Sequence, residues 1–183
     1  LQLTKRRNWE QNAGEPALSR DGRYLYYSED VSAGGGFQYN RDPYGVIYTI
    51  QRLDRETGKV ETYINDAGGS VRPQVSPDGK TIAFLSSRSG SSQIWTIDVA
   101  GGEAIKKSDF PIDVDNVQWS PDGTRMAFSA EVYPDCADMD CTAKRDKEKE
   151  DNPVKARVYT KLMFRHWDTW KDGKRSHVFI WPG

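Results

Sequence analysis

The residues best suited to bind a ligand are Glu131 and an aromatic and basic segment, R-H-W-D-T-W, at residues 165–170. A carboxylate in a partly desolvated place can hold a free α-amino group, as recognition of the amino terminus of a peptide requires. We therefore expect Glu131 to anchor an amine. Trp167 and Trp170 would then form an apolar wall for the second residue of a short peptide. Arg165 would pair with Glu131 or receive a backbone carbonyl.

The same residues also fit a purely structural role. Trp and His side chains near the edge of a sheet commonly pack and form hydrogen bonds, and Asp168 stands where it would cap a turn. Both interpretations place Glu131, just beyond a predicted strand, close to the segment that returns at 165–170. The sequence leaves the two interpretations open.

Serine nucleophiles are not expected in this chain. A nucleophile elbow needs Gly two residues before and two residues after the Ser. Ser70 and Ser92 each have the first Gly and lack the second, and no other Ser has both. We therefore assign no catalytic residue.

Cys136 and Cys141 form a single C-x4-C pair. A structural zinc site needs four ligands, and the nearby Asp residues lack the spacing of a calcium loop. We expect a disulfide that closes a small loop, with free thiols and a metal site as alternatives. A disulfide would indicate the periplasm or a secreted protein, because the cytosol keeps thiols reduced.

Charge and composition exclude several classes of partner. The 183 residues include 26 Lys and Arg against 27 Asp and Glu, so the basic surface typical of nucleic-acid binders is not expected. No apolar stretch approaches the roughly 20 residues that cross a membrane. Residues 34–36 are Gly without the pattern of a phosphate-binding loop, so no cofactor is expected. The charged run 144–151 is balanced and indicates a solvated insertion.

A repeat organises the elements that must position these residues. The pattern apolar-Ser-x-Asp-Gly followed by an apolar run and Ser occurs three times, with its Asp at positions 21, 78 and 122. The spacings are 57 and 44, and the shorter is close to the ~40–45 residues of a four-stranded propeller blade. A Gly-rich insertion at 32–44 accounts for the longer spacing. Pro and Gly in the pattern predict a tight turn between two strands.

The apolar run after each turn predicts a strand buried on both faces. In the second copy, Ile82 and Phe84 would lie on one face, with Ala83 and Leu85 on the other. Such a strand needs sheets packed above and below it. Stacked blades supply that arrangement.

No segment shows sustained helical periodicity over more than about two turns. The sequence therefore predicts an all-β fold of antiparallel, four-stranded blades of a β-propeller. The blades would be residues 1–70, 71–115 and 116–183, the last with a charged insertion at 134–163. Closed propellers typically have four to eight blades, so about three blades make an incomplete one. We expect a portion of a larger propeller, or assembly with further copies, because an isolated stack would leave two apolar faces exposed.

The repeated S-P-D-G-x-x-I-A-F pattern resembles that of TolB-like propellers. Residues 129–136 and 162–180, with R-H-W-D-T-W-K-D-G-K-R-S-H-V-F, are similar to propellers of the prolyl oligopeptidase family, of the dipeptidyl peptidase V and acylaminoacyl peptidase types. Residues 22–61 resemble more closely the TolB-type propellers attached to amidohydrolases. The resemblance implies that the Ser-His-Asp triad belongs to a separate hydrolase domain.

These observations predict the propeller portion of a serine exopeptidase that gates or anchors short peptides. The alternative is a noncatalytic TolB-like module that binds a protein or peptide, engineered or self-assembling as a homo-oligomer. The expected partners are short peptides and the missing hydrolase domain or further blades.

Overall fold

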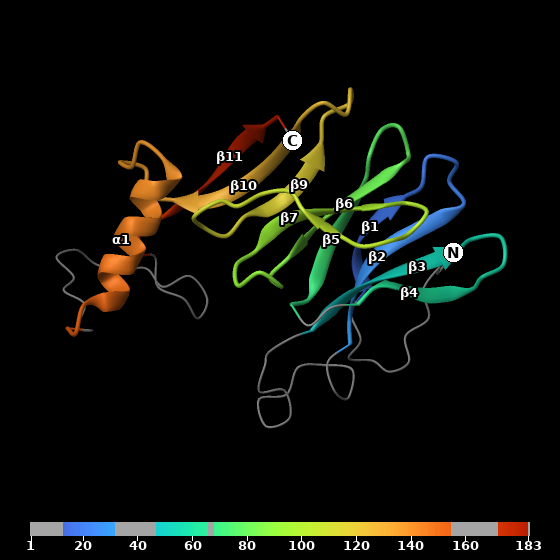
Figure 1. The fold of residues 1–183 in the computed structure, drawn as a ribbon, viewed down its shortest axis with the longest axis horizontal. Coiled ribbons are helices and arrows are strands. Elements are labelled where there is room, and N and C mark those ends of the chain that lie inside the picture. Colours follow the sequence, from blue (N-terminus) through green and yellow to red (C-terminus); the bar gives the residue numbers. More distant parts are fainter. Residues whose placement is uncertain (1–12, 32–46, 66–67, 155–171, 183) are drawn as a thin grey trace.

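The computed structural model describes residues 13–31, 47–65, 68–154 and 172–182. In these ranges the chain forms three antiparallel sheets and one helix, and the sheets follow one another in chain order (Figure 1). The expected all-β, antiparallel architecture is confirmed. None of the described helical structure is long and apolar enough to span a bilayer.

Each sheet is built from neighbouring segments of the chain. Sheet 1 contains β1 (Ala13–Leu18), β2 (Tyr24–Asp30), β3 (Tyr48–Asp54) and β4 (Val60–Ile64). Sheet 2 contains β5 (Ser70–Val75), β6 (Thr81–Ser86), β7 (Gln93–Asp98) and β8 (Ile105–Lys106). Sheet 3 contains β9 (Asp115–Trp119), β10 (Met126–Val132) and β11 (Arg175–Trp181).

The three Ser-x-Asp-Gly turns, at 19–22, 76–79 and 120–123, form the same hydrogen bonds. In each, the Ser hydroxyl donates to the Asp Oδ1 at 2.5 Å. The Gly N–H donates to the Ser carbonyl at 2.8 to 2.9 Å. The Gly φ angles are 71° to 76°, a left-handed conformation that Gly adopts without steric cost. The turns join the first and second strand of each sheet, as the repeat predicts.

Strand β6 is buried on both faces, also as predicted. Ile82 and Phe84 lie on one face, and Ala83 and Leu85 lie on the other. The first pair belongs to a cluster with Tyr26, Ile50, Ile64 and Ile97. The second pair belongs to a cluster with Ile94, Val114, Val117, Met126, Phe128 and Ala130. Sheet 2 therefore packs between sheets 1 and 3.

The two outer faces of the stack differ. Val178 and Ile180 on β11 are 76% and 70% exposed. Leu25, Tyr27 and Leu53 form a third apolar cluster on sheet 1, and none is more than 8% exposed. The expectation of two exposed apolar faces was therefore wrong for sheet 1, because these side chains are covered.

The structure also contains a helix that no periodicity in the sequence indicates. Helix α1 (Met139–Asp151) has 13 residues and lies within the charged insertion. Its buried side chain is Thr142, so no apolar stripe marks it in the sequence. Asp138 caps the helix, and its Oδ1 accepts a hydrogen bond from the N–H of Cys141 at 2.8 Å.

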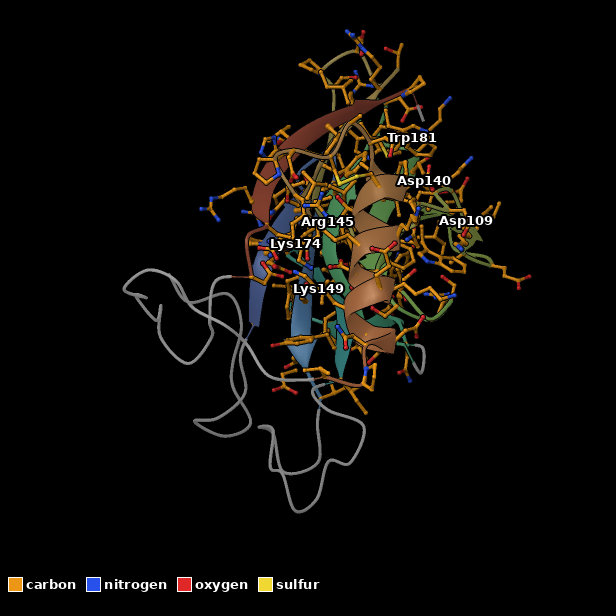
Figure 2. The ribbon with its side chains drawn as sticks, turned by 90° about the vertical axis from the view of Figure 1, so that its left-hand side faces the viewer. Asp109, Asp140, Arg145, Lys149, Lys174 and Trp181 are labelled. Carbon is orange, nitrogen blue, oxygen red and sulfur yellow. A yellow bond between two sulfur atoms is a disulfide. The ribbon has the colours of Figure 1, made fainter. Side chains whose placement is uncertain are left out.

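Contacts of Tyr133 hold α1 against the end of β10. The Tyr133 hydroxyl donates to Asp146 at 2.8 Å and accepts from Lys149 at 2.6 Å. Arg145 and Lys149 project from the helix (Figure 2), and their charged groups lie 4.5 Å from the centre of the Tyr133 ring. Arg145 also forms two hydrogen bonds with the Asp135 carboxylate, at 2.8 and 2.9 Å. Tertiary contacts thus stabilise a helix whose sequence lacks apolar residues at helical spacing.

Candidate functional site

Three residues other than Gly adopt left-handed backbone angles at equivalent positions of the three sheets. Glu15 in β1, Arg72 in β5 and Asn116 in β9 have φ values of 57°, 55° and 55°. Each lies in the first strand of its sheet, where the strand pairing is irregular. A left-handed residue other than Gly costs roughly 1–2 kcal/mol, so the surrounding contacts must hold these conformations.

Arg72 connects the three sheets through these places. Its Nη1 lies 3.0 Å from Glu15 Oε1, and its Nε lies 2.6 Å from Asp115 Oδ1. Its backbone N–H donates to Glu15 Oε2 at 3.0 Å, and Ser28 Oγ donates to the same oxygen at 2.9 Å. One charged residue of each sheet, Glu15, Arg72 and Asp115, therefore takes part in a single row of ion pairs.

In sheet 3 this row continues into a polar network. Asn116 Nδ2 donates to Ser129 Oγ at 2.8 Å, and the Asn116 N–H donates to Asp115 Oδ1 at 2.8 Å. Ser129 Oγ is also 3.3 Å from the carbonyl of Asp115. These hydrogen bonds therefore link β9 to Ser129, a buried residue of β10.

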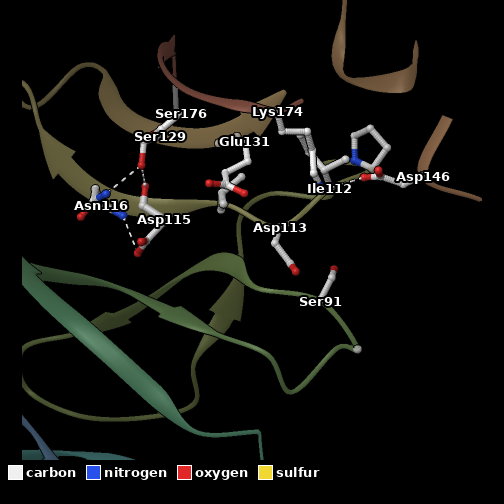
Figure 3. A pocket seen from close by; sticks show the side chains of 14 residues that line it. Ser91, Ile112, Asp113, Asp115, Asn116, Ser129, Glu131, Asp146, Lys174 and Ser176 are labelled. Carbon is white, nitrogen blue, oxygen red and sulfur yellow. Dashed lines mark hydrogen bonds and ion pairs between the residues drawn. The ribbon is translucent and has the colours of Figure 1, made fainter. Parts of the chain in front are cut away.

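A cavity of about 510 Å³ lies beside this network. Residues 90–91 and 111–114 form one side of it, and β9, β10 and β11 supply the other (Figure 3). Its polar lining includes Ser91, Asp113, Asp115, Asn116, Ser129, Glu131, Asp146 and Lys174. Its volume is in the range of ligand-binding clefts. It is therefore the best candidate for a functional site among the described residues.

Most of the charges in the cavity are paired. Asp115 pairs with Arg72, and Asp146 lies 3.2 Å from Lys174. Burial opposes the charged form of Lys174, yet its bonds to Asp146 and Asp172 raise the pKa of this amine above its usual value. Lys174 therefore stays charged at neutral pH and is occupied by these carboxylates.

The exceptions are Asp113 and Glu131, and both residues are exposed. Glu131 lies on β10, opposite Ser176 of β11, and its side chain points into the cavity (Figure 3). Within the described residues, no side chain forms an ion pair or hydrogen bond with its carboxylate. Two residues further along the chain, burial and the hydrogen bond to Asp146 raise the pKa of Tyr133 to about 12, so the Tyr133 phenol stays neutral at physiological pH. Among the described residues, the Glu131 carboxylate in this cavity thus has no cationic partner.

The other predicted binding residues, Arg165, Trp167 and Trp170, lie outside the described residues. The expected meeting of Glu131 with this segment therefore stays a prediction. Sequence reasoning missed Asp113 and Asn116, although the acidic string D-V-D-N at 113–116 directly precedes the third repeat and could have drawn attention to them.

The structure joins Cys136 and Cys141 in a disulfide. The bond links the loop after β10 to the first turn of α1. In the part of the chain that the structure describes, no three His, Cys, Asp or Glu side chains gather in a way that could hold a metal ion.

Comparison with solved structures identifies the architecture. A TolB structure from Agrobacterium tumefaciens matches with a TM-score of 0.54 and 25% identity, over 74% of this chain and 43% of that one. Pyrococcus horikoshii acylaminoacyl peptidase matches with a TM-score of 0.56 and 17% identity, over 94% of this chain and 23% of that one. The three sheets are β-propeller blades. They form an incomplete propeller, as the repeat predicts.

Curated sequences agree with this fold. Dipeptidyl-peptidase 5 of Porphyromonas endodontalis is 26% identical over 80% of this chain. A peptidase of Bacillus subtilis, YuxL, is 33% identical over 52% of it. The chain spans 22% and 17% of the lengths of these two relatives. No protein-family model matches. The resemblance to TolB-like propellers of the prolyl oligopeptidase family is confirmed, whereas the separate likeness of residues 22–61 to amidohydrolase propellers stays a prediction.

Proposed function

We propose that this chain is the propeller portion of a serine exopeptidase and anchors short peptides by their amino terminus. The observation that carries the proposal is the Glu131 carboxylate, which lines a cavity of about 510 Å³ and has no cationic partner among the described residues. The names of the two peptidase relatives support the enzyme class. Hydrolysis would belong to a separate domain with a Ser-His-Asp triad.

The chemistry of the anchor is a charge-assisted hydrogen bond. A protonated α-amino group would donate to the Glu131 carboxylate, and such bonds are shorter and stronger than those between neutral groups. Asn116 and Ser129, on the same cavity, would border the peptide backbone. Arg165, Trp167 and Trp170 are proposed to complete the site as a carbonyl ligand and an apolar wall.

Calorimetric titration of the chain with Ala-Phe amide and with its N-acetyl derivative tests the proposal. The free amine is expected to bind about tenfold more tightly than the acetylated peptide, because acetylation removes the positive charge. Glu131→Gln should abolish this difference, whereas Glu103→Gln, which changes an exposed carboxylate in the loop between β7 and β8, should preserve it. Equal binding of both peptides to the unchanged protein would contradict amine anchoring.

We place the protein in the periplasm or outside the cell. The Cys136–Cys141 disulfide supports this location, because disulfides persist in oxidising compartments. Fractionation of cells that produce the full-length protein, followed by thiol labelling, tests it. Labelling of both Cys without prior reduction would contradict it.

A noncatalytic TolB-like binding module is the second candidate. The TolB match, which covers 74% of this chain, supports it. Such a module would bury the exposed Val178 and Ile180 against further blades or a second copy. Light scattering, together with the peptide titration above, distinguishes the two candidates. A homo-oligomer that binds no small peptide favours the binding module.

A further inference from the structure

The segment between β8 and β9, residues 107–114, forms much of one wall of the cavity and contains no helix or strand. Residues 111–114 line the cavity on the side that also carries Ser91 (Figure 3). A connecting segment of this kind moves more than the strands around it unless other contacts hold it. The contacts that hold residues 107–114 therefore also determine the shape of the cavity.

Gln93, the first residue of β7, holds this segment through its side-chain amide. Its Oε1 accepts hydrogen bonds from the N–H of Phe110 at 2.9 Å and from Ser108 Oγ at 2.8 Å. Its Nε2 lies 3.1 Å from the carbonyl oxygen of Phe110 and 3.3 Å from that of Ile112. Nε2 also lies 3.1 Å from Ser91 Oγ. One amide thus bonds to both segments that form this wall.

The amide of Gln93 is fully buried, with 0% of the residue exposed. Burial of an amide is costly unless it forms hydrogen bonds, so the buried amide and its partners fix one another in place. The ring of Phe110 also packs on Phe128 of sheet 3, with the ring centres 4.7 Å apart. The wall is therefore attached to sheet 2 by Gln93 and to sheet 3 by Phe110.

From this arrangement we infer that Gln93 is a positioning residue for peptide binding, which holds the cavity wall in its binding shape before a ligand enters. Gln93 does not itself line the cavity and acts through residues 111–114. A wall that is ordered in advance loses little freedom when the peptide binds, so the affinity is higher than with a mobile wall. The inference rests on the proposed function and adds to it a residue remote from the ligand.

Gln93→Met tests this role, because Met has a similar length and cannot form the hydrogen bonds of the amide. Calorimetric titration with Ala-Phe amide should show an affinity about threefold to tenfold lower, with a less favourable entropy of binding. Hydrogen exchange in the free variant should accelerate at the amides of residues 108–114. Ser108→Ala, which removes one bond to Oε1, should lower the affinity by a smaller factor and serves if the Met variant does not fold.

Ile50→Ala is the control for a loss of stability alone. Ile50 is fully buried in the apolar cluster shared by sheets 1 and 2, away from the cavity. This variant should be less stable and still bind Ala-Phe amide with unchanged affinity.

The outcomes separate this role from amine anchoring. Faster exchange at residues 108–114 with unchanged peptide affinity overturns the positioning role, and so does an equal loss of affinity in Ile50→Ala. In either case, a free amine that still binds more tightly than its N-acetyl derivative supports amine anchoring. Failure of Ala-Phe amide to bind the unchanged protein overturns the proposed function and, with it, the role of Gln93.

Discussion

The Nη1 atom of Arg72 lies 3.0 Å from Oε1 of Glu15, although the two residues belong to different sheets and are 57 positions apart. Both have left-handed backbone angles at matching bulges of their first strands. Because Arg72 also pairs with Asp115, one side chain connects all three sheets. Two of the left-handed positions thus take part in an ion-pair network that joins the sheets.

Replacing Arg72 with Met should lower the free energy of unfolding by about 1–3 kcal/mol, because Glu15 and Asp115 lose their shared partner. Urea denaturation followed by tryptophan fluorescence measures the change. Arg125→Met is the matched control, since that Arg is exposed and its side chain forms no ion pair among the described residues. Equal effects of the two substitutions would contradict a connecting role.

Phe84→Ala should cost about 3–5 kcal/mol of stability, because Phe84 is fully buried between sheets 1 and 2. Val178→Ala should change stability by less than about 0.5 kcal/mol, since Val178 is exposed on β11. The midpoints and slopes of urea unfolding curves provide both values. A large effect of Val178→Ala would instead show that its face is covered in solution.

Acid should destabilise the three repeated turns. Hydrogen bonds from Ser120 and from the N–H of Thr124 lower the pKa of Asp122 to about 2, from a usual value of 3.8. The equivalent bonds also lower the pKa values of Asp21 and Asp78. The folded protein therefore binds fewer protons than the unfolded chain, so this stabilisation is complete above about pH 4 and is lost as the pH falls toward 2.

Urea midpoints measured between pH 2 and pH 6 test this dependence. In a variant with Asn at all three positions, stability should fall less steeply over the acidic range. An unchanged slope would mean that other carboxylates determine acid unfolding.

The disulfide should stabilise α1 more than the sheets. Loop entropy for a ring of this size amounts to about 2 kcal/mol, and the bond closes a local loop at the start of the helix. With both Cys replaced by Ser, hydrogen exchange should accelerate within α1 while the amides of β6 keep their protection. Uniform acceleration in both elements would contradict local stabilisation.

The features that the sequence predicted are those that depend on local patterns. The Ser-x-Asp-Gly turns form from hydrogen bonds among neighbouring residues, so their type and position follow from composition and spacing. The alternation of Ile82, Ala83, Phe84 and Leu85 also predicted the two buried faces, because side chains in a strand alternate in direction. The sequence also predicted the Cys136–Cys141 disulfide, and it singled out Glu131, which lines the cavity and whose binding role stays a prediction.

Features that depend on contacts between distant segments required the tertiary structure. Helix α1 has no apolar period, and it is held by Tyr133, Asp135 and a cap at Asp138. The pairing of Arg72 with Glu15 and Asp115 depends on strand bulges that bring three sheets together, which no local pattern encodes. The sequence by itself determined the turns, the strands and the propeller architecture. The fold alone decided which charges are paired, because ion pairing depends on distances between residues remote in the chain.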